Sequence, residues 1–242
     1  MTDETNVEPT APETPEEETP EVPLPPFYKR FVDVFFNPSR LGAALKEHPK
    51  WGVAMLTGIV LVTVMTALIP SEVWQEMQRQ TLLRSGQNVT DVPASAQAIV
   101  NVTRYLTGLI GIPISEFIFA GIVMLIFAFI MGDEGKYRQY LAMVSHAWLV
   151  TVTVELLLVP LKIAQSNPQA TVSVGSFFFF LPQGYLLKAL SLLAFSKLWT
   201  SLVLAAGVQH LSPKRTFASA ATILIGINVI SAFLFALLPG TG

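Results

Sequence analysis

The chain has 242 residues, of which 52% are hydrophobic and only 13% are charged, whereas ordinary soluble domains carry about 25% charged residues. It contains no cysteine, which excludes disulfides, thiol catalysis and thiolate metal sites. The net charge of −2 says little about partners, because the charge is unevenly placed along the chain; nucleic acid is not an expected partner.

The N-terminal tail, residues 1–26, differs in composition from the rest of the chain. It is rich in Pro, Glu and Thr and holds eight of the 17 acidic residues but no Lys or Arg. The remaining 216 residues therefore carry nine acidic against fifteen basic side chains. Because the tail has almost nothing to bury, it is expected to be disordered.

An amphipathic segment follows at residues 27–50. Phe27, Phe31 and Phe35 recur at every fourth position, and Phe36 lies beside them. The segment is too short to span a bilayer but suits the headgroup level, so these four phenylalanines are predicted to be interfacial anchors. Asn37-Pro38 predicts the start of a second short helix within the same segment.

Five apolar segments make up most of the remaining chain, at 51–69, 106–131, 141–161, 186–208 and 217–238. A helix needs about 20 apolar residues to cross a bilayer, and backbone groups in hydrocarbon must be satisfied within the segment. The sequence therefore predicts an all-α, polytopic transmembrane helix bundle of about five spans, with an external loop at 70–105.

The orientation follows from the positive charges of the short loops, which favour the cytoplasm. Four basic residues fall on the face that carries the 70–105 loop, against nine on the N-terminal face, so the N-terminus is predicted to be cytoplasmic. The nine are Lys29, Arg30, Arg40, Lys46, Lys50, Lys136, Arg138, Lys214 and Arg215.

Three charged residues lie well inside the apolar segments: Glu116, Glu155 and Lys197. Lys188 lies close enough to the external interface to snorkel. A charged residue at the centre of a span costs roughly 2.5–3.5 kcal/mol on insertion scales. With Asn228, the three fall at comparable heights in the predicted bundle, so they are expected to meet as an intramembrane polar cluster. Two roles stay open for it, a structural ion pair that neutralises itself and a proton or ion relay.

Catalytic and cofactor motifs are missing from the sequence. There is no phosphate-binding or dinucleotide-binding glycine motif, and His48, His146 and His210 fall in three different segments without a partner at metal-ligand spacing. We therefore expect no enzyme activity, no cofactor and no metal site.

Several motifs resemble those of the Yip family, membrane proteins named for interacting with Ypt/Rab GTPases. They are FFNPSR at 35–40, GDEGKYRQYLA at 132–142, LWT at 198–200 and SPKRT at 212–216. The resemblance covers residues 31–238 and implies five spans with a cytosolic N-terminus. For eukaryotic members it also implies vesicle traffic through Rab binding.

The chain departs from the eukaryotic branch of that family. It lacks the Asp-Leu-Tyr-Gly-Pro signature, and its N-terminal tail is short. These differences argue against a Rab-type GTPase as partner and favour a bacterial-type member. The bacterial cytoplasmic (inner) membrane is the expected location, with the endoplasmic reticulum or Golgi membrane as the alternative.

Two functions compete at this point. The first is a non-enzymatic scaffold or organiser of membrane proteins or lipids, with the bilayer and membrane or cytosolic proteins as partners. The second is an ion- or proton-coupled transporter or channel that uses Glu116, Glu155, Lys197 and Asn228. A ridge of small residues at Ala218, Thr222 and Gly226 permits close helix approach, which leaves a homo-oligomer open.

Overall fold

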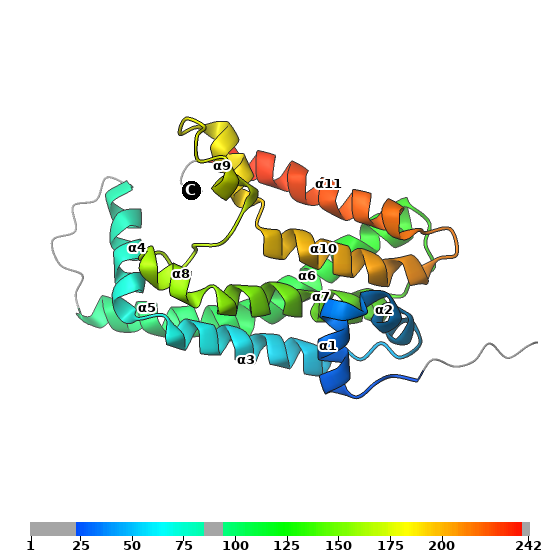
Figure 1. The fold of residues 1–242 in the computed structure, drawn as a ribbon. Helices are drawn as coiled ribbons and strands as arrows, with labels where there is room; N and C mark the ends of the chain where they lie inside the picture. Colours follow the sequence, from blue (N-terminus) through cyan, green and yellow to red (C-terminus); the bar gives the residue numbers. More distant parts are fainter. Residues whose placement is uncertain (1–22, 85–93, 239–242) are drawn as a thin grey trace, which may run out of the picture.

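The structure is a computed structural model that describes residues 23–84 and 94–238, and in this part of the chain it is almost entirely helical (Figure 1). Most of the predicted acidic tail lies outside the described residues. In chain order the helices are α1 (Phe27–Phe36), α2 (Pro38–Glu47), α3 (Gly52–Leu68), α4 (Ser71–Arg84), α5 (Ala94–Leu106), η1 (Thr107–Gly111), α6 (Ile112–Met124), η2 (Leu125–Ile130), α7 (Tyr137–Leu157), α8 (Val159–Ala164), η3 (Val174–Phe177), α9 (Tyr185–Leu192), α10 (Phe195–Val208), η4 (Gln209–Leu211) and α11 (Phe217–Ala236).

Three continuous helices are long and apolar enough to cross a membrane: Asn101–Ile130, α7 and α11. The first runs from α5 to η2 and includes two π-type stretches. A fourth candidate is α3 taken together with α4, but the two are bent by 87°. The all-α, polytopic class is thus confirmed with three or four candidate spans, and the number five stays a prediction.

The predicted segment 186–208 is not one helix. It is divided into α9 and α10 by a break at Leu193 and Ala194. An extended stretch of the preceding loop satisfies the backbone there: Val174 N–H donates to the Leu193 carbonyl (2.9 Å) and Phe195 N–H donates to the Val172 carbonyl (3.0 Å). Non-helical backbone at membrane depth is tolerated where protein buries it in this way.

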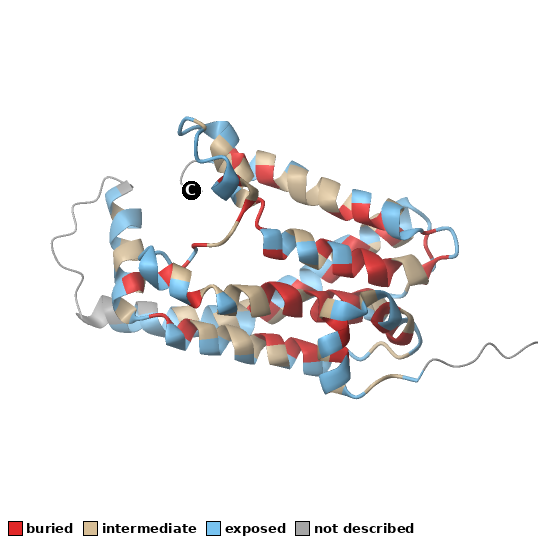
Figure 2. Ribbon diagram, viewed as in Figure 1, coloured by how far each residue is buried: buried red, intermediate tan, exposed pale blue. Residues whose placement is uncertain are grey.

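Helix α7 forms the centre of the bundle and packs against α3, α6 and α10. Figure 2 shows the buried positions concentrated on α7, on the facing side of α10 and on α2. Because α7 has neighbours on several sides, its buried residues follow almost without interruption. They include Tyr140, Leu141, Ala142, Met143, Val144, Ser145, His146, Ala147, Leu149, Val150, Thr151 and Val152.

The N-terminal unit, α1 and α2, completes this core instead of lying apart from it. Phe27, Phe31 and Phe35 are half-buried against the core, and the Phe35 ring meets Trp199 of α10 edge-on at 5.7 Å. Phe36, by contrast, is 77% exposed. The fourfold spacing of the first three phenylalanines thus marks a face that protein covers, and of the four predicted anchors Phe36 presents its side chain outward.

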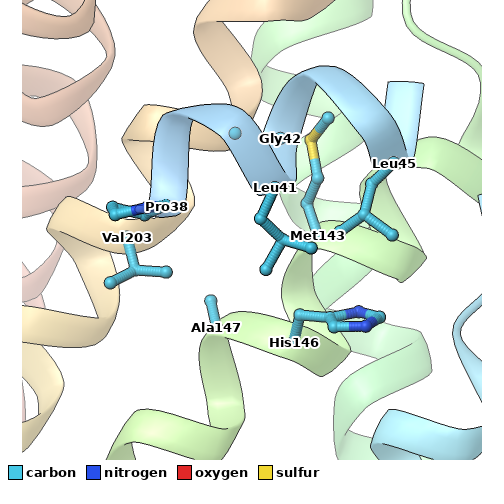
Figure 3. A pocket seen from close by; sticks show the side chains of 9 residues that line it. Pro38, Leu41, Gly42, Leu45, Met143, His146, Ala147 and Val203 are labelled. Carbon is cyan, nitrogen blue, oxygen red and sulfur yellow. The ribbon is translucent and has the colours of Figure 1, made fainter. Parts of the chain in front are cut away.

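Helix α2 crosses α10 at unusually close range. A Cβ built on Gly42 would lie 2.6 Å from the Cα of Gly207 and 2.9 Å from the Ala206 carbonyl oxygen. The close approach lets Leu41 and Leu45 reach towards α7 and α10, where they line a small cavity of about 10 Å³ with His146, Met143, Ala147 and Val203 (Figure 3). That volume suits about one water molecule.

The crossing makes Gly42 intolerant of a side chain. We expect Gly42→Ala to push α2 from α10 and to lower the free energy of unfolding in detergent by about 1–3 kcal/mol, as overpacking does. Thermal unfolding of the purified protein measures this. Gly226→Ala is the matched control, because a Cβ there meets nothing within 4 Å. If the two substitutions lower the free energy of unfolding equally, the close approach of α2 to α10 at Gly42 is contradicted.

Candidate functional site

Glu155, near the end of α7, is the centre of a buried polar network. Its Oε2 accepts a hydrogen bond from Lys162 Nζ at 2.8 Å, and its Oε1 accepts from Thr171 Oγ1 at 2.7 Å and Ser196 Oγ at 3.0 Å. The side chains of Lys162 and Glu155 are 3% and 18% exposed. The pair is thus neutralised and largely removed from solvent.

The network joins four pieces of chain. Glu155 belongs to α7, Lys162 to α8, Thr171 to the extended stretch after α8, and Ser196 to the first turn of α10. Lys162 Nζ also donates to the Ala170 carbonyl at 2.7 Å. The ion pair therefore holds the α8–α9 connection against the break between α9 and α10, which is the place where the backbone most needs support.

Glu116, on α6, lies in a separate environment. It is 2% exposed, and its Oε2 accepts a hydrogen bond from Ser145 Oγ at 2.6 Å. Among the described residues, its Oε1 and the indole Nε1 of Trp148 have no hydrogen-bond partner. Both atoms lie 3.9 Å from the position that a Cβ on Gly58 of α3 would take. Ser145 and Glu155 are ten residues apart on α7, so the two carboxylates are separated by about 15 Å along the helix.

The other two predicted cluster residues are also placed apart from Glu116. Asn228 Nδ2 donates to Ser201 Oγ at 2.7 Å and so joins α11 to α10. Lys197 is exposed on α10. The structure thus pairs Glu155 with Lys162 and does not assemble Glu116, Glu155, Lys197 and Asn228 into one cluster.

At the opposite end of the bundle, which we call the α2 end, Arg30 joins α1 to α7. Its Nη1 lies 3.1 Å from His146 Nε2, while His146 Nδ1 lies 2.8 Å from the Ala142 carbonyl oxygen. Since a carbonyl only accepts and a guanidinium only donates, the ring is the neutral tautomer protonated at Nδ1. Burial lowers the pKa of Arg30, and its guanidinium also lies over the Phe27 ring at 5.2 Å.

A second contact fastens α2 to the end of α10. His210 Nε2 lies 2.9 Å from Ser39 Oγ, and Gln209 Nε2 donates to the same hydroxyl at 3.2 Å. Burial lowers the pKa of His210. Together with Arg30 and His146, these side chains attach the N-terminal unit to α7 and to the end of α10.

The two turns at the α2 end are tied by an ion pair that the sequence did not predict. Arg215 donates from Nε and Nη2 to the two carboxylate oxygens of Asp133 at 2.9 and 2.8 Å, and its Nη1 donates to Ser219 Oγ at 2.8 Å. These hydrogen bonds raise the pKa of Arg215. A signal did exist, because Asp133 and Arg215 each fall in one of the two turn motifs at 132–142 and 212–216.

None of these centres is arranged to bind a metal ion. Within residues 23–84 and 94–238, no three His, Asp or Glu side chains are grouped as ligands. The arrangement instead cross-links helices, with a buried ion pair at each end of the bundle and hydrogen bonds between them.

A stability measurement can distinguish Lys162, the observed partner of Glu155, from Lys197, the basic residue that the sequence grouped with it. Lys162→Met should lower the free energy of unfolding by about 3–5 kcal/mol, because it leaves a buried carboxylate without its cation. Adding Glu155→Gln should restore most of that loss. Thermal unfolding in detergent measures both. Lys197→Met is the control and should change stability by less than about 0.5 kcal/mol; a larger loss there than at Lys162 would contradict the observed pairing.

The Asp133–Arg215 pair should be equally sensitive. Asp133→Asn leaves a buried guanidinium without its counter-ion, so we expect a loss of about 3–5 kcal/mol in unfolding free energy. Arg215→Lys keeps the charge but not the two-pronged geometry and should show an intermediate loss. Glu134→Gln in the same turn is the control. If it lowers the unfolding free energy as much as Asp133→Asn does, the loss comes from the change in net charge and not from breaking the ion pair.

Comparison with known proteins identifies one family that matches most of the chain. A sequence model of a family, the Yip1 domain, matches residues 32–238. The match includes the second half of α1 and every helix after it. No curated protein and no solved structure matches.

Proposed function

Because the chain belongs to the Yip1 family and is an integral membrane protein, we propose that it is a non-enzymatic scaffold that organises lipids or other proteins at the membrane surface. The observation that carries this proposal is the N-terminal unit. One face of α1 is bound to the bundle through Arg30 and Phe35, while Tyr28, Val32 and Phe36 on another face are 66%, 50% and 77% exposed.

The exposed face of α1 has the character of a membrane-surface element. Tyr28, Val32 and Phe36 are four residues apart and so form one apolar stripe. Basic side chains are exposed nearby in sequence, at Lys29, Arg40, Lys46 and Lys50. Apolar residues with adjacent bases bind the boundary of an anionic leaflet. We place this stripe on the cytoplasmic side, in agreement with the distribution of basic loop residues.

The interior of the bundle supports the same proposal. Glu155, Lys162 and Asn228 are bonded to other side chains of the bundle, and the cavity beside His146 is about 10 Å³. These groups hold helices together. The partners that we propose are therefore outside the bundle: the lipid surface first, and membrane or cytosolic proteins held beside it. The inner membrane of a bacterium is the proposed location.

Reconstitution into vesicles of phosphatidylcholine and phosphatidylglycerol tests this function. Cryo-electron microscopy measures the vesicle diameter, and an entrapped pH-sensitive dye measures proton flux. Wild-type protein should shift the diameter distribution relative to protein-free vesicles. Tyr28→Ser, Val32→Ser and Phe36→Ser combined should lose at least half of the shift, because the stripe no longer favours the lipid boundary.

Leucine at the same three positions is the matched control and should retain the shift, since it keeps the apolar surface. Proton flux should equal that of protein-free vesicles for all variants. A flux that depends on the protein and disappears in folded Glu155→Gln or Glu116→Gln would overturn the proposal in favour of a transporter. An unchanged diameter with wild-type protein would also overturn it.

A further inference from the structure

The connection between α8 and α9 contains an aromatic loop, residues 177–181, that the network at Glu155 does not use. From residue 163 to residue 187 the chain carries no charged side chain. Within this stretch Phe177, Phe179 and Phe180 are 62%, 84% and 69% exposed. Exposed aromatic clusters of this kind are rare in contact with water and mark a surface that something apolar covers.

The aromatic loop is held in place at its base. Ser173 pairs with Ala194 as an isolated antiparallel bridge. Gly175 lies so close to α9 that a Cβ there would meet Ser191 backbone atoms at 2.7–2.8 Å. The Phe177 ring contacts the Phe195 ring edge-on at 5.6 Å. The loop is therefore presented in one orientation relative to α10.

The height of the loop follows from the pairing of α10 with α11. These helices run antiparallel and are joined by the hydrogen bond between Ser201 and Asn228. Phe195 is six residues before Ser201, so it lies level with Leu234, six residues after Asn228. Leu234 is two residues, about 3 Å, inside the end of α11 at Ala236. Phe177, which contacts Phe195, is thus at the edge of the membrane-spanning layer.

The segment that follows confirms this height. Tyr185, the first residue of α9, donates its hydroxyl to the Phe233 carbonyl at 3.0 Å. Figure 1 shows the loop before α9 beside the end of α11. The loop therefore lies level with the end of α11.

We propose that the aromatic loop is immersed in the lipid leaflet at the α8 end of the bundle, with Phe177, Phe179 and Phe180 in contact with acyl chains. Aromatic rings favour this depth of a bilayer, and the stretch has no charge to oppose it. Helix α11 also exposes apolar side chains, at Ile230 and Leu234. The protein thus contacts lipid through an element that is not a span.

The absence of cysteine makes a direct test simple. A polarity-sensitive fluorophore is attached to single cysteines introduced as Phe179→Cys, Ile230→Cys and Lys214→Cys in the full chain, reconstituted in phosphatidylcholine–phosphatidylglycerol vesicles. Ile230, 61% exposed on α11, is the lipid reference, and Lys214, exposed in the turn before α11, is the water reference. Quenching is measured with spin-labelled lipid and with aqueous iodide added to both sides.

The label at position 179 should be quenched by spin-labelled lipid at least threefold more than the label at 214, and iodide quenching should be correspondingly weaker. Quenching like that at 214 overturns the proposal. Protection from both quenchers also overturns it, because the loop would then be covered by a second copy of the chain. If thermal unfolding shows that Phe179→Cys is not folded, Phe180→Cys gives the same test.

Discussion

Hydrocarbon offers no partner to a polar group, so every donor and acceptor inside this bundle depends on what the chain itself can supply. The break between α9 and α10 shows the consequence. Leu193 and Phe195 would leave backbone groups open there, and the extended stretch that follows α8 closes them. Glu155 then fixes this stretch through Thr171 and fixes α8 through Lys162. A broken helix can persist in the bundle because an ion pair and a short antiparallel contact hold its two sides.

The same constraint explains why the N-terminal unit is part of the fold. Helix α7 carries a histidine deep in the bundle, and Arg30 of α1 supplies its hydrogen-bond donor. In the same region Gly42 and Gly207 let α2 approach α10 closely enough to bury Leu41 and Leu45. Dispersion contacts drive such close packing where no hydrophobic effect acts between helices in lipid. The unit is therefore fixed relative to the bundle, and so is the orientation of its exposed stripe.

The helical class and most of the spans could be read from the sequence because a long apolar run has one structural solution in a bilayer. The partner of Glu155 could not. Counting residues along straight spans placed Lys197 near it in height, but α10 begins only at Phe195, and Lys197 faces outward from its first turn. Similarly, the spacing of Phe27, Phe31 and Phe35 predicted one shared face without showing that the bundle lies against it. Asp133 and Arg215 lie in turns 82 positions apart, where no periodicity links them.

At the α2 end the buried charges of Asp133 and Arg215 are matched to each other, as are those of Glu155 and Lys162 at the α8 end. The outer surface of the bundle is not uniform. Along α3 no exposed side chain is charged. Val53, Leu56, Val60 and Val64 are exposed, and the exposed Thr63 donates its hydroxyl to the Ile59 carbonyl, as contact with acyl chains requires. On α1 and α2 exposed apolar side chains occur together with exposed lysine and arginine. Such a mixture is stable where lipid tails give way to charged headgroups, so the N-terminal unit is the part of the described chain suited to meet both the bilayer and proteins outside it.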